Sequence, residues 1–255
     1  MPTLRFVIEY DGTDFAGWQA QAPGARTVQG ALEAALLRVT GCATRVAGAG
    51  RTDAGVHAEG QLASCRIETR LDAATLARAL NAVLPPDLAV RSAEEAPAEF
   101  HARRAARGKL YRYRVWNGPV RSPLRERTHA FVRAPLDLGA MRRGAAPLVG
   151  RHDFASFETR GRESGRAGDA GPAGSTVRTL FRVEVGGTSG AEVFLDFEGD
   201  GFLRYMVRSL AGTLLEVGRG VRPEADLARV LAARDRREAG PTAPARGLVL
   251  VRVDV

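Results

Sequence analysis

The sequence predicts an α+β protein built from two similar halves. Stretches that alternate between apolar and polar residues, as strands do, are separated by stretches with apolar residues at helical spacing. In each half these elements follow the order of the split β-α-β units of ferredoxin-like domains. Apolar residues make up 45% of the 255-residue chain, an ordinary fraction for burying cores. We therefore expect two α+β halves, 1–105 and 106–255, with a central, mostly antiparallel sheet and helices packed on it.

The first half is expected to contain four strands and two helices. Its first strand alternates and ends at an Asp-Gly turn. Thr27 can cap the start of the first helix and Gly41 its end, whereas Asp72 caps the second helix and Pro85 terminates it. The expected elements are strands at 4–10, 44–47, 61–67 and 88–92 and helices at 28–40 and 73–84.

The second half repeats this pattern without evident sequence identity to the first. Its expected elements are strands at 109–116, 128–132, 176–185, 192–197 and 248–253, helices at 137–149 and 202–217, and a short helix from Pro223. The segment 158–175 is rich in glycine and charge and poor in apolar residues, so it cannot pack a core. We expect a mobile loop there.

The charge of the chain favours a polyanionic partner. Its formal net charge is +8 and its isoelectric point is near 10.5, and summed positive charge attracts phosphates. Lys109 is the only lysine, so the basic groups are almost all guanidinium groups, which pair with phosphates and stack on bases. Nucleic acid is the leading candidate, although the arginine bias could also reflect genome composition.

The sequence predicts a reduced, cytoplasmic protein that holds no metal. Cys42 and Cys65 are the only cysteines, and their spacing fits neither a metal site nor a disulfide framework. The four histidines lie far apart in sequence and lack the spacing of zinc ligands. No apolar run is long enough to span a bilayer, so no membrane association is expected.

The stretch Ala47 to His57, AGAGRTDAGVH, is the leading candidate for chemistry. Asp53 lies among glycines that let a bulky ligand approach the main chain. Arg51 would favour its ionised carboxylate, which can act as a nucleophile or as a base. Alternatively, Asp53 only stabilises a glycine-rich turn through hydrogen bonds to its own backbone.

Two further stretches carry candidate binding residues. Along the strand FHARRAARGKLYRYRVW, alternation places Tyr111 on one face and Arg112 on the other, so one face could stack a base. The alternative is a half-buried strand with solvated arginines. In FLRYMVRSLAG, Arg204 and Arg208 lie one turn apart, and a partly buried Arg208 would need a carboxylate such as Asp53. The alternative is that both arginines are exposed and unpartnered.

Two other functions compete with catalysis on RNA. FVIEYDGTDF superficially matches the motif of aspartate-nucleophile phosphatases, but Glu9 replaces the first aspartate and Lys109 would have to be the essential lysine. A non-catalytic RNA-binding module would explain the charge and the aromatic residues equally well. It would not explain an acidic side chain on a surface that binds phosphates.

The motif GRTDAGVHAEGQ resembles the catalytic motif of the tRNA pseudouridine synthase A family, and the setting makes it highly specific. Further stretches on both sides of this motif resemble blocks of that family, occur in the family's order and cover essentially the whole chain: YDGTDFAGWQ, TVQGALEAAL, FHAR, YRYRVWN, HDFASF, FLRYMVRSLAGTLLEVG and APARGLVLVRV. The chain departs from the family at a few positions, namely Arg104 and Ala105 after FHAR, Ser209 for a common Asn, Ala245 for a proline and Val255 at the end. These departures affect substrate positioning and local packing rather than the reaction.

The resemblance implies a pseudouridine synthase fold and the isomerisation of uridine to pseudouridine at positions 38, 39 and 40 of the tRNA anticodon stem-loop. It implies that Asp53 is the nucleophile, that Tyr111 stacks on the everted base and that Arg208 pairs with the aspartate. Arg51 and His57 flank Asp53 and are expected to contact the substrate. No cofactor is expected because the reaction has no redox step, and the family works as a homodimer with basic clefts for the RNA.

Overall fold

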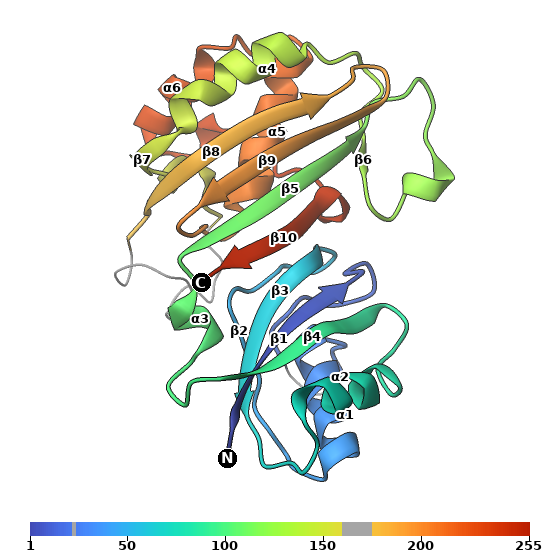
Figure 1. Cartoon of the computed structure of the whole chain (residues 1–255). Coiled ribbons are helices and arrows are strands. Elements are labelled where there is room, and N and C mark those ends of the chain that lie inside the picture. Colours follow the sequence, from blue (N-terminus) through green and yellow to red (C-terminus); the bar gives the residue numbers. More distant parts are fainter. Residues whose placement is uncertain (22–23, 160–174) are drawn as a thin grey trace. The chain divides into compact units, whose positions relative to one another are not determined.

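The computed structural model describes residues 1–21, 24–159 and 175–255. By contacts between Cα atoms it divides into two compact units, the first formed by Met1–Arg107 with Leu250–Val255 and the second by Gly108–Val249. The last strand, β10 (Leu248–Asp254), therefore begins in the second unit and ends in the first. Each unit is a mixed α+β structure, as the sequence predicts (Figure 1).

The first unit is a small antiparallel sheet with helices on it. Strand β1 lies between β4 and β3, and the short β2 pairs with β3. Figure 1 shows α1 and α2 on one face of this sheet. The elements before β10 are β1 (Thr3–Tyr10), α1 (Val28–Thr40), β2 (Ala47–Gly48), β3 (His57–Arg66), α2 (Ala73–Asn81), β4 (Leu88–Ala96) and α3 (Ala102–Ala105).

Strand β1 supplies the centre of this unit's core. Its alternate side chains Leu4, Phe6, Ile8 and Tyr10 are at most 3% exposed, and the side chains between them are half-buried. At roughly 25 cal/mol per Å², burying one large apolar side chain stabilises the fold by about 1.5–3 kcal/mol. The alternation read from the sequence is therefore confirmed, and the strand ends where expected, at Tyr10.

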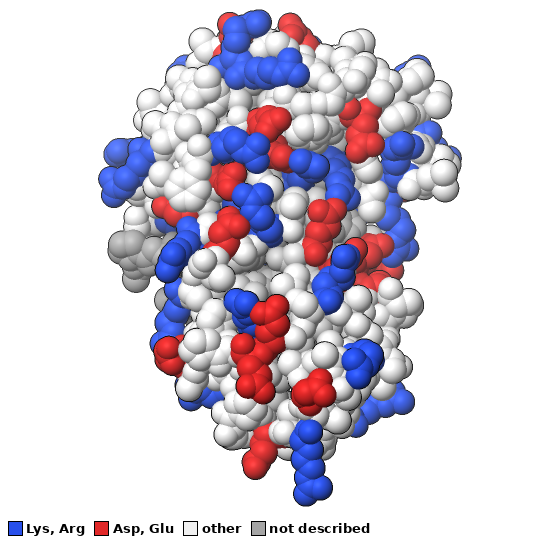
Figure 2. Space-filling model, viewed as in Figure 1, with Lys and Arg blue, Asp and Glu red and all other residues white. Residues whose placement is uncertain are grey.

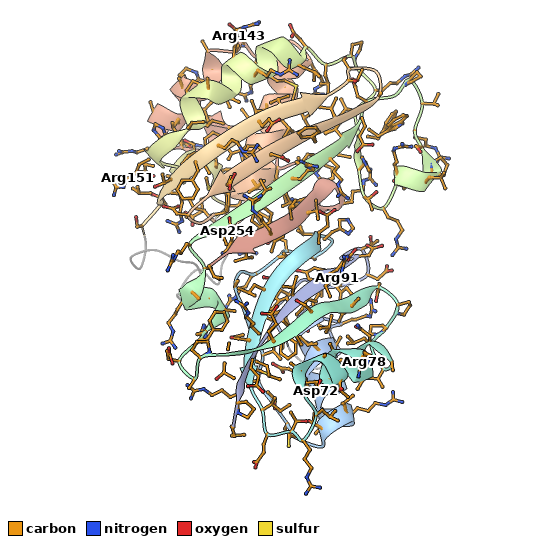
Figure 3. All side chains as sticks on the ribbon, viewed as in Figure 1. Asp72, Arg78, Arg91, Arg143, Arg151 and Asp254 are labelled. Atoms are coloured by element: carbon orange, nitrogen blue, oxygen red, sulfur yellow. The ribbon has the colours of Figure 1, made fainter. Side chains whose placement is uncertain are left out.

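The predicted helix caps of the first unit are also confirmed. The Thr27 side chain accepts a hydrogen bond from the Gly30 N–H, and Gly41 ends α1 in the left-handed conformation. Asp72 accepts from the Thr75 N–H at the start of α2, with Arg78 in the last turn (Figure 3). The Thr75 hydroxyl also donates to the Asp72 carboxylate. The two hydrogen bonds from Thr75 lower the pKa of the Asp72 carboxyl below its usual value.

The second unit has a larger antiparallel sheet, in the order β5-β9-β8-β7, with β6 parallel to the end of β5. Helix α4 packs against α5, α6 and strand β8, so the helices cover one face of the sheet (Figure 1). The strands are β5 (Gly108–Trp116), β6 (Ala130–Phe131), β7 (Gly150–Asp153), β8 (Val177–Gly187) and β9 (Glu192–Gly199). The α-helices are α4 (Leu138–Ala145), α5 (Met206–Gly218) and α6 (Asp226–Ala233). The single 3-10 turns are η1 (Pro123–Arg125), η2 (Ala146–Leu148), η3 (Ala155–Phe157), η4 (Arg236–Glu238) and η5 (Ala245–Gly247).

Several boundaries differ from the sequence-based expectation for local physical reasons. Helix α5 begins at Met206 rather than at 202, because Tyr205 has φ 61°, a left-handed conformation that a right-handed helix cannot contain. Helix α2 ends at Asn81 rather than at 84. The Asn81 side chain donates to the Val90 carbonyl oxygen and accepts from the Val90 N–H, which ties the end of the helix to β4. Helix α4 ends at Ala145 and continues as a 3-10 turn.

Two elements were missed and others are shifted. Strand β7 carries polar residues without alternation, and only its pairing with β8 identifies it as a strand. The four-residue helix α3 is too short to give a periodic signal. Strand β3 begins earlier than expected, at His57, and β2 is two residues long at 47–48. Most of the segment for which a mobile loop is expected, 160–174, lies outside the described residues.

No helix in the described ranges combines the length and the hydropathy needed to cross a bilayer.

Candidate active site

Asp53 lies at the start of a tight turn in the first unit, just before β3. The Val56 N–H donates to the Asp53 carbonyl oxygen over 3.1 Å, which closes the turn. Gly55, its third residue, has φ 78°, a conformation that residues with a side chain rarely adopt. The Asp53 side chain is half-buried and interacts with other groups, whereas Ala54 beside it is exposed. The glycines of the motif therefore shape a turn that brings a carboxylate to the surface.

The loop 11–18 packs directly on this turn. The Trp18 N–H donates to the Thr52 carbonyl oxygen over 3.0 Å, and the Gly55 N–H donates to the Phe15 carbonyl oxygen over 3.3 Å. A Cβ atom on Gly12 would lie only 2.0 Å from the Val56 carbonyl oxygen, so only glycine fits there. The block YDGTDFAGWQ is thus the structural support of the Asp53 turn, a role that its sequence alone did not indicate.

His57 connects the same two segments from inside the unit. Its ring is buried, and Nδ1 lies 3.0 Å from the Gly12 nitrogen and 3.1 Å from the Asp11 Oδ1. An unprotonated Nδ1 accepts the Gly12 N–H, and a protonated one donates to Asp11. His57 therefore holds the loop 11–18 against the turn in either protonation state.

Arg51 differs from His57 in its surroundings. Its side chain is exposed, and within the described residues we find no hydrogen bond or ion pair for it. The structure therefore shows no contact of Arg51 with the Asp53 carboxylate within the described residues, and the exposed Arg51 side chain is available to a ligand.

Tyr111 and Arg208 belong to the second unit. Tyr111 lies on β5, is 7% exposed and packs edge to face against Phe202, with ring centroids 5.1 Å apart. The predicted alternation of β5 is confirmed, because Tyr111 and Tyr113 are buried whereas Arg112 and Arg114 are half-buried. Arg112 is held by two hydrogen bonds of 2.7 Å to Asp196 on β9.

Arg208 is fixed by contacts to the main chain and to a ring. Its Nε donates to the Ala243 carbonyl oxygen over 2.8 Å, and its guanidinium lies 4.8 Å from the centre of the Tyr205 ring. Arg204 stacks on the same ring at 5.1 Å. Two such stacks, each worth about 0.5–1 kcal/mol at exposed sites, offset the cost of about 1–2 kcal/mol for the left-handed backbone of Tyr205. Arg204 precedes α5, so the two arginines meet on a ring rather than along one helix face as expected.

The net positive charge is divided unevenly between the units. The first unit contains 13 arginines and 13 acidic residues, so its formal charge is zero, and the +8 of the chain comes entirely from 108–249. On the face in view in Figure 2 both signs are interspersed, in agreement with ion pairs such as Arg5–Glu94 and Arg182–Glu198. The exposed Arg151 on β7 makes no ion pair within the described residues and belongs to the surplus of the second unit, whereas Arg143 on α4 pairs with Glu224 (Figure 3).

No group of three or more histidine, cysteine or acidic side chains in the described part of the chain could hold a metal ion, and both cysteines are free. Glu9, the first acid of the phosphatase alternative, lies on β1 and pairs with Arg91 on β4.

Comparison with known proteins identifies the family. The family model described as tRNA pseudouridine synthase matches residues 6–103 and 145–254. The tRNA pseudouridine synthase A of Myxococcus xanthus is 50% identical over 99% of this chain and 92% of the relative. Those of Syntrophotalea carbinolica and Geobacillus kaustophilus are 47% and 45% identical over 99% and 98% of this chain, and over 96% and 93% of the relatives.

The chain belongs to the tRNA pseudouridine synthase family.

The resemblance read from the motif blocks is therefore confirmed, and the protein is an isomerase that forms pseudouridine in tRNA. Among solved structures, a chain of a Cbf5–Nop10–Gar1 complex matches with 12% identity and a TM-score of 0.36, covering 97% of this chain and 58% of that one. Family membership rests on the sequence relatives. The two alternative functions, an aspartate-nucleophile phosphatase and a non-catalytic RNA-binding module, do not agree with membership of this family.

Proposed function

We propose that this tRNA pseudouridine synthase isomerises uridines 38, 39 and 40 of the anticodon stem-loop, with Asp53 as the nucleophile. The Asp53 turn is the observation that carries the proposal. It presents a half-buried carboxylate on a backbone that hydrogen bonds to the loop 11–18 hold in place. In the reaction the bond from N1 to C1′ breaks and a bond from C5 to C1′ forms. The C5 proton is lost and N1 gains one, so atoms and electrons balance without a redox partner or a cofactor.

The target uridine must leave the helical stack to meet Asp53, which costs roughly a few kcal/mol. Stacking on an aromatic ring contributes about 1–3 kcal/mol per base, and we assign this role to Tyr111. Its edge-to-face packing against Phe202 supports the assignment, because a ring held in one orientation loses little entropy when it binds a base. We further propose that Arg51, which is exposed, contacts the RNA backbone. For His57, from which a substrate contact is expected, the buried position supports a different role, which is to keep the turn in place for the substrate.

The proposed role of Arg208 is to keep the Asp53 carboxylate ionised next to the detached base. A carboxylate removed from water is destabilised unless a cation compensates it. Arg208 suits that role because its Nε bond to Ala243 and its stack on Tyr205 fix the guanidinium.

The proposed assembly is a homodimer in the cytoplasm. Leu124 and Val120, in the segment between β5 and β6, are 93% and 70% exposed, and exposed apolar groups of this kind favour association. A monomeric mass in light scattering would contradict the dimer.

Mapping of pseudouridine tests the proposed targets. In tRNA from cells that lack the gene, positions 38, 39 and 40 are expected to contain uridine, and the purified enzyme should restore pseudouridine there. Purified protein should also release tritium from tRNA labelled with [5-³H]uridine, because the C5 proton leaves in the reaction. Pseudouridine unchanged at these positions in the deletion strain would disprove the target assignment.

The uneven charge predicts where the RNA backbone is bound. Arg121 and Arg133 of the second unit are exposed and make no ion pair within the described residues. Each phosphate contact that is lost reduces the slope of log affinity against log salt by about 1. We expect R121Q/R133Q to weaken tRNA binding and to flatten that slope in filter-binding titrations.

The matched control is R38Q/R70Q, which removes two exposed arginines from the neutral first unit. This control should bind tRNA with the salt dependence of the wild type. If both double variants changed the slope equally, the second unit would not be the main electrostatic contact.

A further inference from the structure

Three polar side chains are buried beneath the Asp53 turn and are not part of the reaction described above. Tyr10 at the end of β1 is 3% exposed, Thr52 is 6% exposed, and Gln61 on β3 is fully buried. The Tyr10 and Thr52 hydroxyl oxygens are 2.8 Å apart, and the Gln61 Nε2 donates to the Gly50 carbonyl oxygen over 2.9 Å. We call Tyr10, Thr52 and Gln61 the buried polar cluster.

The hydroxyl of Tyr10 shares a buried hydrogen bond with Thr52. Burial raises the pKa of Tyr10 to about 12. The hydroxyl therefore stays protonated at any working pH, and it can donate one hydrogen bond while accepting another. Tyr10 acts as a neutral connector and not as a base.

The cluster holds the main chain on both sides of Arg51. Gln61 binds the carbonyl group of Gly50, and Tyr10 binds the side chain of Thr52, the residue before Asp53. The Thr52 carbonyl oxygen is held in addition by the Trp18 N–H. Tyr10 and Gln61 lie on paired strands, where Tyr10 faces Ala58 and Ile8 faces Gln61, so their positions are set by the sheet.

A turn anchored to a sheet through buried hydrogen bonds is more rigid than a loop held at its surface. Displacing a reacting group by about 1 Å can cost about 100-fold in rate. None of the three side chains needs to touch RNA for this effect, because they act through the main chain of the turn.

We propose that Tyr10, Thr52 and Gln61 are positioning residues that fix the backbone of the Asp53 turn and thereby set kcat without contributing to tRNA binding. This inference rests on the proposed role of Asp53.

The test measures kcat and KM for tritium release together with the tRNA Kd. Tyr10→Phe removes only the hydroxyl and Thr52→Val removes only its partner, and each is expected to lower kcat about tenfold, the effect of losing one ordinary hydrogen bond. Gln61→Met should have a similar effect, and KM and Kd should stay within about twofold. Thr52→Ser keeps a hydroxyl and should retain most of the activity. Because Tyr10 and Thr52 share one bond, Y10F/T52V should be little worse than either single variant.

Asn81→Leu is the matched control for a loss of stability. Asn81 makes two hydrogen bonds of 2.8 Å to the Val90 main chain in the same unit, where α2 ends. This variant should lower Tm as much as Tyr10→Phe does and leave kcat unchanged. Wild-type kcat in both Tyr10→Phe and Thr52→Val, or an equal loss of kcat in Asn81→Leu, would overturn the inference. Activity in Asp53→Asn would instead refute the proposed role of Asp53, so the two failures are distinguishable.

Discussion

Asp53→Asn is expected to abolish tritium release from [5-³H]uridine-labelled tRNA and to leave tRNA binding nearly intact. The amide has almost the same size as the carboxylate, so the turn closed by the Val56 N–H and the support from Phe15 and Trp18 should persist. The amide is uncharged and a poor nucleophile, so the reaction loses the group that starts it. We expect a fall of at least about 10⁴-fold in kcat, comparable to the loss of an essential nucleophile elsewhere.

Binding and folding controls separate this effect from damage to the turn. The Kd for tRNA should stay within about twofold of the wild type, and the thermal unfolding curve should be unchanged within a few degrees. Substantial turnover by Asp53→Asn would remove Asp53 from the mechanism. If the wild type itself released no tritium, the non-catalytic binding module would be the better description.

Arg208→Met is expected to lower kcat by about two to four orders of magnitude. Removing the cation from a carboxylate that is shielded from water costs about 3–5 kcal/mol, and each 1.36 kcal/mol corresponds to a factor of ten. Methionine keeps much of the apolar stem of the side chain, so packing in α5 should change little. Arg208→Lys retains the charge but loses the Nε bond to Ala243. Its kcat should lie between those of Arg208→Met and the wild type.

Arg204→Met is the matched control because Arg204 stacks on the same Tyr205 ring but is exposed. It removes one arginine of the same charge from the same ring, so an effect of general charge or of Tyr205 packing would show in both variants. We expect Arg204→Met to keep kcat within about threefold of the wild type. Equal losses in the two variants would mean that Arg208 acts through the Tyr205 ring and not on a carboxylate.

Much of the first unit follows from local sequence. The alternation of β1 buries Leu4, Phe6 and Ile8, and Thr27 and Asp72 cap the helices as their chemistry predicts. These features depend on neighbours within a few residues, which is why periodicity and capping rules find them. The predicted start of α5 was wrong because it depends on contacts that local rules do not cover. The left-handed Tyr205 is maintained by stacks with Arg204 and Arg208, and no propensity rule favours a tyrosine there.

The candidate site shows the same division. The glycine-rich stretch around Asp53 and its family resemblance identified the turn. By contrast, the support from Gly12, Phe15 and Trp18 could not be read from YDGTDFAGWQ, which looks like a polar loop. Gly12 was the available signal for this packing, because a side chain at position 12 would overlap the Val56 carbonyl group.

The family, most of the order of strands and helices in the first unit and the residue proposed to start the reaction could be read from the sequence, because these are properties of short motifs and periodic patterns. The fold was needed to show that Tyr10 and Thr52, 42 residues apart in the chain, meet beneath the Asp53 turn, and that the terminal strand is shared between two units. Such contacts depend on the register in which distant strands pair. That register is set by the packing of the whole sheet and not by the residues on either side.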